Sequence, residues 1–160
     1  MNLDGNGNTA ITGATWQFTA DAAIPTVTSI VRKTPVAALT NAGSVVFTVN
    51  FSENVTGMAS NDFSASVGSF TGTTGAISVS GATGTSVDVT IASVAGNGTL
   101  GLNVLTANTI TDTPGNLLAS GTPTLTNETY TIDQAPPTVT SIVRKTPATS
   151  LTNATTVVYT

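Results

Sequence analysis

The chain has 160 residues, 39% of them hydrophobic and only 8% charged, and its four lysines and arginines against eight aspartates and glutamates give a net charge of −4. So few cations exclude a basic patch and, with it, a nucleic-acid-binding surface. Cysteine and histidine are absent, which excludes disulfide bonds, thiol catalysis and the commonest general base.

Hydrophobic and polar residues alternate with a period of two along most of the chain. This pattern is typical of half-buried antiparallel strands, and no stretch has the sustained 3.6-residue period of a helix. Turns rich in glycine and asparagine divide the pattern, at 41–43, 72–75, 81–84 and 96–98. We predict seven strands, at about 26–32, 44–51, 62–67, 76–80, 85–92, 99–105 and 128–133.

Seven short strands within about 100 residues predict an all-β fold, an immunoglobulin-like antiparallel β-sandwich. The apolar positions of one parity should face its interior. They are Val45, Phe47, Val49, Phe51, Val87, Val89, Ile91, Leu100, Leu102, Val104, Tyr130 and Ile132. A slip of one residue would exchange the two faces of a strand, so an exposed Phe47 or Val89 would contradict this register.

The chain also repeats itself. Pro25–Pro35 recurs letter for letter at Pro137–Pro147, and the match continues without a gap to the last residue. The period of about 112 residues exceeds the ~20–50 residues of solenoid repeats and has the size of an autonomous domain. The sequence therefore predicts the end of one repeat at 1–20, a complete repeat at 25–133 and the start of another at 137–160.

Short linkers join these repeats. They read Asp21–Pro25 before the complete repeat and Asp133–Pro137 after it. Proline fixes φ, so we expect stiff junctions and domains that stand end to end. The incomplete repeats cannot bury Trp16, Phe18 or Tyr159 alone, so we expect these residues to pack on material outside the chain. That material is either the rest of a longer polypeptide or a neighbouring copy that exchanges strands.

Several segments of the complete repeat resemble the bacterial Ig-like tandem repeats of large secreted adhesins and extracellular surface fibres. They are VVFTVNFSENVTG at 45–57, Asn61–Phe63, Val94–Leu102, Ile110–Asn116 and Tyr130–Asp133, in the family's order. The resemblance implies an extracellular protein at the bacterial cell surface, built from many copies as an extender or adhesive fibre. Several such families bind calcium between domains.

The residues give a separate argument for calcium. Because successive strands reverse direction, the loops after the second and sixth strands return to the end where the chain enters. This places five oxygen-bearing side chains at one inter-domain pole: Asp21, Glu53, Asp62, Asp112 and Asn116. Calcium takes 6–8 oxygen ligands of these kinds. With so few cations nearby, the acids would repel one another unless an ion or protons neutralised them.

A second, partial copy of this pattern lies in the flanking repeats. Asp4 and Asn8 align with the acid and the amide of the 112–116 loop, and Asp133 takes the place of Asp21 at the next junction. The alternative needs no metal, because Asp-Thr-Pro-Gly-Asn at 112–116 forms a tight turn by itself and the other acids can cap strands and turns.

We expect a structural or adhesive role and no enzymatic activity, because no nucleophile has a histidine or lysine nearby. Its partners would be neighbouring repeats or copies of itself. No apolar run approaches the ~20 residues of a membrane helix, so we expect no membrane insertion in this segment. The alternative is a module that binds glycans or a host surface through polar loops, with Trp16 or residues 117–126 as the contact.

Overall fold

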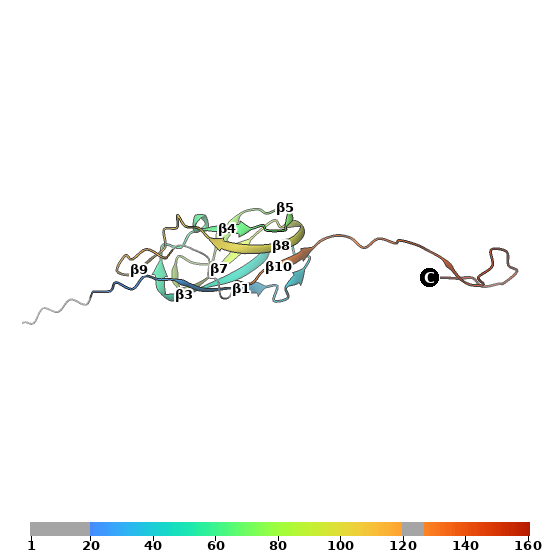
Figure 1. Cartoon of the computed structure of the whole chain (residues 1–160), viewed down its shortest axis with the longest axis horizontal. Coiled ribbons are helices and arrows are strands. Elements are labelled where there is room, and N and C mark those ends of the chain that lie inside the picture. The colour runs from blue at the N-terminus through green and yellow to red at the C-terminus, as the bar shows by residue number, and fades with distance from the viewer. Residues whose placement is uncertain (1–19, 120–126) are drawn as a thin grey trace, which may run out of the picture.

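The computed structural model describes residues 20–119 and 127–160, and nearly all of their regular structure is strand (Figure 1). Within these residues the helical content is one 3-10 turn, Ser60–Asp62. No helix in the described part of the chain is long and apolar enough to cross a membrane. The prediction of an all-β protein is therefore confirmed.

One sheet runs in the order β1-β3-β7-β6, with β9 beside the far end of β3. Its strands are β1 (Val27–Thr34), β3 (Val45–Thr56), β6 (Ile77–Val79), β7 (Thr83–Ile91) and β9 (Thr111–Asp112). All of its strand pairs are antiparallel.

The second sheet runs in the order β2-β10-β8-β4, with β5 also paired to β8. Its strands are β2 (Leu39–Thr40), β4 (Phe63–Ser66), β5 (Thr71–Thr73), β8 (Ala95–Val104) and β10 (Tyr130–Asp133). Here the expectation of wholly antiparallel pairing is wrong at one place. β2 pairs with β10 in parallel, because the chain crosses from the first sheet to the second after β1.

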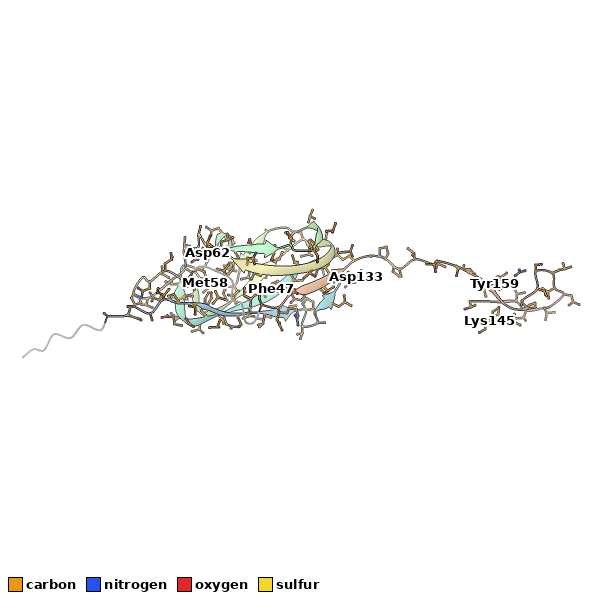
Figure 2. All side chains as sticks on the ribbon, viewed as in Figure 1. Phe47, Met58, Asp62, Asp133, Lys145 and Tyr159 are labelled. Atoms are coloured by element: carbon orange, nitrogen blue, oxygen red, sulfur yellow. The ribbon has the colours of Figure 1, made fainter. Side chains whose placement is uncertain are left out.

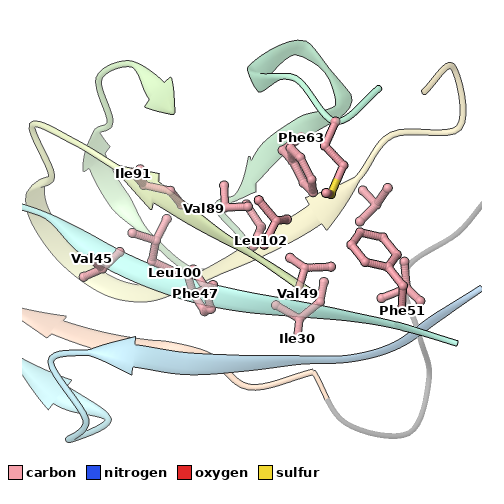
Figure 3. Close-up of a cluster of buried hydrophobic side chains, with 14 of the residues drawn as sticks. Ile30, Val45, Phe47, Val49, Phe51, Phe63, Val89, Ile91, Leu100 and Leu102 are labelled. Carbon is pink, nitrogen blue, oxygen red and sulfur yellow. The ribbon is translucent and has the colours of Figure 1, made fainter. Parts of the chain in front are cut away.

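The inward faces of both sheets build one hydrophobic core (Figure 3). Every residue assigned to the interior from the alternating pattern is buried, and Phe47 and Val89 are both 0% exposed, which confirms the register. The core also takes residues that the alternating pattern did not assign: Ile30 lies within β1, and the others lie near strand ends or in loops. The full set is Val27, Ile30, Val55, Met58, Phe63, Val94, Ile110 and Leu118.

Two predicted turns are wholly or partly strand. Turns were expected at 72–75 and 96–98, but residues 72–73 lie in β5 and 96–98 in β8, and the two strands pair with Gly72 opposite Gly96. A Cβ on Gly72 would lie 2.1 Å from the Ala95 carbonyl oxygen, and one on Gly96 would lie 2.3 Å from the Thr71 carbonyl oxygen. These glycines therefore let the two strand backbones approach closely, which is a common role of glycine within strands.

Tyr130 ties the end of the chain to its beginning. Its ring packs edge-on against Phe47, with 5.0 Å between the ring centroids. Its hydroxyl donates to the carbonyl oxygens of Pro35 at 2.8 Å and Val46 at 2.9 Å, although a hydroxyl has one proton to share between them. The last strand of the sandwich thereby holds β1 and β3 in place from the opposite sheet.

After β10 the chain leads away from the sandwich and ends in a small hairpin (Figures 1 and 2). The hairpin joins β11 (Arg144–Thr146) to β12 (Val158–Tyr159). The apolar side chains of β12 are exposed, Val158 by 45% and Tyr159 by 58%. The chain enters and leaves the sandwich at opposite ends of its long axis (Figure 1).

Candidate metal site and the two chain junctions

Three carboxylates meet where the chain enters the sandwich. Oxygen atoms of Asp21, Glu53 and Asp112 lie within 4.8 Å of one another. Asp21 is exposed on the entering linker, Glu53 is half-buried and Asp112 is buried. The structure thus brings together three of the five residues that the sequence assigned to this pole.

A distortion in β3 delivers Glu53 to this cluster. Glu53 was expected in a loop, but β3 continues to Thr56 and its pairing with β7 shifts register between Asn50 and Val55. Such a bulge bends the strand and redirects its side chains. Asp112, likewise expected in a loop, lies in β9 and is opposite Val55 of β3. Strand pairing, and not loop convergence alone, builds the cluster.

The Asp112 carboxylate organises the turn that follows it. One oxygen accepts hydrogen bonds from the backbone amides of Gly115 at 2.8 Å and Asn116 at 2.7 Å, and the other accepts one from Asn116 Nδ2 at 2.7 Å. Burial would raise the pKa of Asp112, but the hydrogen bonds from Asn116 and Gly115 outweigh it and leave the pKa below its ordinary value. The metal-free interpretation of this turn therefore accounts for these hydrogen bonds of Asp112.

Asn116 holds the linker against this turn. Its Nδ2 also donates to the main-chain oxygen of Asp21 at 3.1 Å. Because the amide nitrogen binds both Asp112 and Asp21, Asn116 acts here as a brace between loop and linker. Its predicted role as a metal ligand stays a prediction.

Glu53 is the carboxylate whose ionisation the cluster disfavours. Burial, followed by the negative charges of Asp112 and Asp21, raises the pKa of Glu53 above its ordinary value. Carboxylates crowded in this way are the ligands that calcium prefers, and a cation would offset their repulsion. The donor set therefore fits calcium, with Asp21, Glu53 and Asp112 as the residues that would hold it.

Asp62 does not belong to this cluster, so its assignment to the metal site is wrong. It lies at the end of the 3-10 turn and is fully buried. Its carboxylate accepts hydrogen bonds from the amide of Ala59 at 2.8 Å, and from the amide and hydroxyl of Thr109 at 2.7 and 3.1 Å. These donors use the carboxylate to fasten two loops together.

The partial copies of the site are described only in part. Asp4 and Asn8, and with them Trp16, lie outside the described residues. Asp133 lies at the far end of the sandwich from the cluster (Figure 2). Its Oδ1 accepts a hydrogen bond from the Ala135 amide at 3.1 Å, and Asp21 Oδ1 accepts one from the Ala23 amide at 3.0 Å. The two aspartates therefore build the same turn at the two junctions.

Gln134 is the junction residue that sequence reasoning missed. Its Oε1 accepts a hydrogen bond from the Gly96 backbone amide at 2.8 Å, and its backbone amide donates to Asn97 Oδ1 at 2.8 Å. Its Nε2 lies within hydrogen-bond distance of three carbonyl oxygens: those of Val94 at 3.1 Å, Asn41 at 3.3 Å and Ala42 at 3.4 Å. A glutamine in a short linker, one alanine before two prolines, carries no signal in the sequence that would distinguish it from an ordinary linker residue.

Comparisons with known proteins add little. No protein-family model matches the chain, and no curated protein matches it. Among solved structures, the N-terminal part of the bacterial S-layer protein SbsC aligns with 77% of this chain at 18% sequence identity and a TM-score of 0.38. The aligned region spans 26% of that chain.

Proposed function

We propose that this chain is part of an extracellular, structural or adhesive rod at a bacterial surface, in which Ig-like sandwiches, one per repeat of about 112 residues, follow one another end to end. The complete unit is 25–133, preceded by the end of one repeat at 1–20 and followed by the start of another at 137–160. The opposite positions of the entering and leaving chain support this arrangement, because each sandwich then passes the chain on along the axis (Figure 1).

The strand order supports an Ig-like topology. An immunoglobulin fold pairs its first, second, fifth and fourth strands in one sheet and its third, sixth and seventh in the other. The seven strands predicted from the sequence fall in that order, as β1-β3-β7-β6 and β10-β8-β4. The additional short strands β2, β5 and β9 attach at the edges and ends of these sheets.

The terminal hairpin is the observation that carries the proposal. Arg144 pairs with Tyr159 and Thr146 with Val158, as Arg32 pairs with Phe47 and Thr34 with Val46 in the sandwich. Each pair is displaced by one repeat, and the register shift between the two pairs recurs too. The hairpin therefore has the geometry of the first strands of a sandwich, while its apolar residues lack the strands that would cover them.

The test is to complete the hairpin. A chain in which residues 49–133 are repeated after Thr160 should form a second sandwich, and backbone amides of 137–160 should become strongly protected from hydrogen exchange. Small-angle scattering should show an elongated particle of two collinear units. Exchange in 137–160 that matches the original chain would contradict the proposal.

We also propose that calcium binds at Asp21, Glu53 and Asp112 and stiffens the junction. Binding to the folded state alone stabilises it, by about 2.7 kcal/mol at a hundredfold excess over Kd. The melting temperature of the Glu53→Gln variant distinguishes calcium binding from a turn that forms without a metal. Without divalent ions the substitution should raise the melting temperature, because a pKa raised by folding costs stability as pH rises above the ordinary pKa of glutamate. When calcium is added, the melting temperature of Glu53→Gln should rise by less than that of the unaltered chain.

The matched control is Asp133→Asn, because Asp133 builds the same turn as Asp21 but lies away from the other two carboxylates. It should leave the response to calcium unchanged, whereas Asp21→Asn should weaken it. Melting curves that coincide in calcium and in EDTA would leave the turn and caps as the whole explanation of these acids.

The alternative function is recognition of a glycan or host surface through polar loops. Trp16 and residues 120–126 lie outside the described residues, and Leu117, at the described start of that loop, is 52% exposed. A glycan screen with the whole chain distinguishes the two functions. Saturable binding that is lost on substitution in residues 117–126 would favour recognition over a purely structural role.

A further inference from the structure

We propose that Asp133 and Gln134 form a two-sided clamp between successive sandwiches. In this arrangement Gln134 binds the sandwich that precedes the linker, and Asp133 binds the entry loop of the sandwich that follows. The partner is thus the next copy of the repeat, and the inference rests on the tandem arrangement proposed above.

The backward half of the clamp is present in the structure. Gln134 bonds to Gly96 and Asn97 in the first residues of β8, and its Nε2 faces carbonyl oxygens from two segments, the loop between β2 and β3 and the turn before β8. Its side chain offers two donors and one acceptor atom, and both kinds are used. A residue held from three directions fixes the direction in which the chain leaves the sandwich.

The forward half is seen at the other junction, where the chain enters the sandwich. There Asn116 Nδ2 donates to the Asp21 main-chain oxygen, and the Asp21 carboxylate lies against Glu53 and Asp112. Pro25 lies two residues after the turn that Asp21 caps, and its carbonyl oxygen accepts a hydrogen bond from the Ala119 amide at 2.9 Å. The entering linker is therefore fastened to the sandwich that it enters.

Because the sequence repeats, the backward contacts and the forward contacts would occur together on one linker. Asp133 is the counterpart of Asp21, and both aspartates cap the amide two residues later at nearly equal distances. At a complete junction the forward contacts fall on Asp133 and the backward contacts on Gln134. Two adjacent residues then bind two sandwiches, which leaves no free residue between the contacts and predicts a stiff connection.

The two junctions of this chain should differ in stiffness. Ala22 occupies the position that corresponds to Gln134, and its methyl group can make none of the hydrogen bonds of the glutamine side chain. In the proposed arrangement the junction before the sandwich therefore lacks the side-chain part of the backward contacts, whereas the junction after it would have both halves of the clamp.

The backward half can be tested on the 160-residue chain. In the unaltered protein the {1H}–15N heteronuclear NOE of Ala135 should equal that of the strands, and the Gly96 amide should exchange slowly. Gln134→Ala should lower the NOE of Ala135 and speed exchange of the Gly96 amide at least about fivefold, as expected for one lost hydrogen bond. Thr140→Ala, in the exposed segment beyond the linker, is the control and should change neither. An unchanged Ala135 NOE in Gln134→Ala would overturn the clamp.

The whole clamp is tested on the completed two-sandwich chain described above. The chain has no cysteine, so Thr73→Cys and the same change at its counterpart in the added repeat would place one spin label in each sandwich. The distance distribution should be narrow, and Gln134→Ala should broaden it about twofold, since the linker then regains freedom. Gln134→Glu should also broaden it, because a carboxylate cannot donate to the three carbonyl oxygens.

The outcomes separate the two proposals. If the added strands fail to protect 137–160, the tandem arrangement itself fails. If the second sandwich forms but its distance distribution is equally narrow in Gln134→Ala, the rod stands and the clamp is wrong. A fall in melting temperature without a change in the distribution or in the Ala135 NOE would assign Gln134 a purely stabilising role in its own sandwich and would overturn the inference.

Discussion

Residues 25–48 and 137–160 are two near copies of one sequence in two environments. Eighteen of their 24 aligned positions are identical, and both place the same residues opposite one another, with the same shift in register. The burial of the copies differs completely. Val45 and Phe47 are 0% exposed, whereas their counterparts Val157 and Tyr159 are 50% and 58% exposed.

This comparison separates local from tertiary contributions. Pairing between the first two strands depends on their own sequence, because the second copy reproduces it without a sandwich around it. The burial of their apolar side chains depends on β7, β8 and β10, which only the first copy contacts. A two-stranded hairpin is marginal in water, so the stabilising free energy of this sequence comes from those other strands.

The largest expected difference between the copies is at the aromatic position. Phe47→Ala should lower the free energy of unfolding of the sandwich by about 3–5 kcal/mol, because it removes a fully buried ring and leaves a cavity beside Tyr130. Tyr159→Ala should leave it unchanged. Urea unfolding of both variants checks this, and equal losses would mean that the hairpin contributes to the sandwich core.

Tyr130 is expected to contribute the next largest effect, because it joins the first copy to the last strand. Tyr130→Phe should cost about 1–3 kcal/mol, since it leaves the carbonyl oxygens of Pro35 and Val46 without their donor. Tyr159→Phe is the control and should change nothing. The same unfolding measurement tests both, and a silent Tyr130→Phe would show that water replaces the hydroxyl.

Arg32 is expected to have a smaller effect. Its guanidinium donates to the Thr129 carbonyl oxygen at 3.0 Å and forms an ion pair with Glu128 Oε1 at 3.5 Å. The guanidinium carbon Cζ lies 6.0 Å from the centre of the Tyr130 ring. Arg32→Gln should therefore cost about 1 kcal/mol. Arg144→Gln should cost nothing, and thermal unfolding of the two variants side by side would reveal any contribution from the second copy.

Lys33 is expected to have the smallest effect, and one that depends on pH. Its hydrogen bond, followed by that of Thr48, lowers the pKa of Asp88 below its ordinary value. The pair therefore stabilises the fold above the ordinary aspartate pKa of about 4, and this contribution is lost as the pH falls through the lowered pKa. Lys33→Gln should cost less than about 1 kcal/mol at pH 7, because the pair is partly exposed.

Repeating the measurement in acid, below the lowered pKa of Asp88, checks the cause. There the unfolding free energies of Lys33→Gln and the unaltered chain should converge. Lys145→Gln, the same change in the second copy, should match the unaltered chain at both pH values. A cost of Lys33→Gln that persists in acid would assign it to packing of the lysine stem.

The sequence alone was sufficient for those features that depend on residues close in the chain. The alternation of Val45, Phe47 and Val49 identified the buried face, because a strand sends successive side chains to opposite sides. The recurrence of 25–35 at 137–147 predicted that the first strands would occur twice, and the pairing of β1 with β3 does recur between β11 and β12. Even the entry pole was located from the sequence, since strand direction determines where each loop returns.

The tertiary structure decided the features that depend on how distant segments meet. A bulge in β3 takes Glu53 to Asp21 and Asp112, while Asp62, assigned to the same pole, is drawn into the interior by Ala59 and Thr109. Nothing in the local sequence distinguishes these two acids. Gln134 likewise finds its hydrogen-bond partners only because three segments present amides and carbonyls to it. Alternation and repetition are local properties of a chain, but the partners of a polar side chain are set by backbone atoms that arrive from elsewhere in the fold.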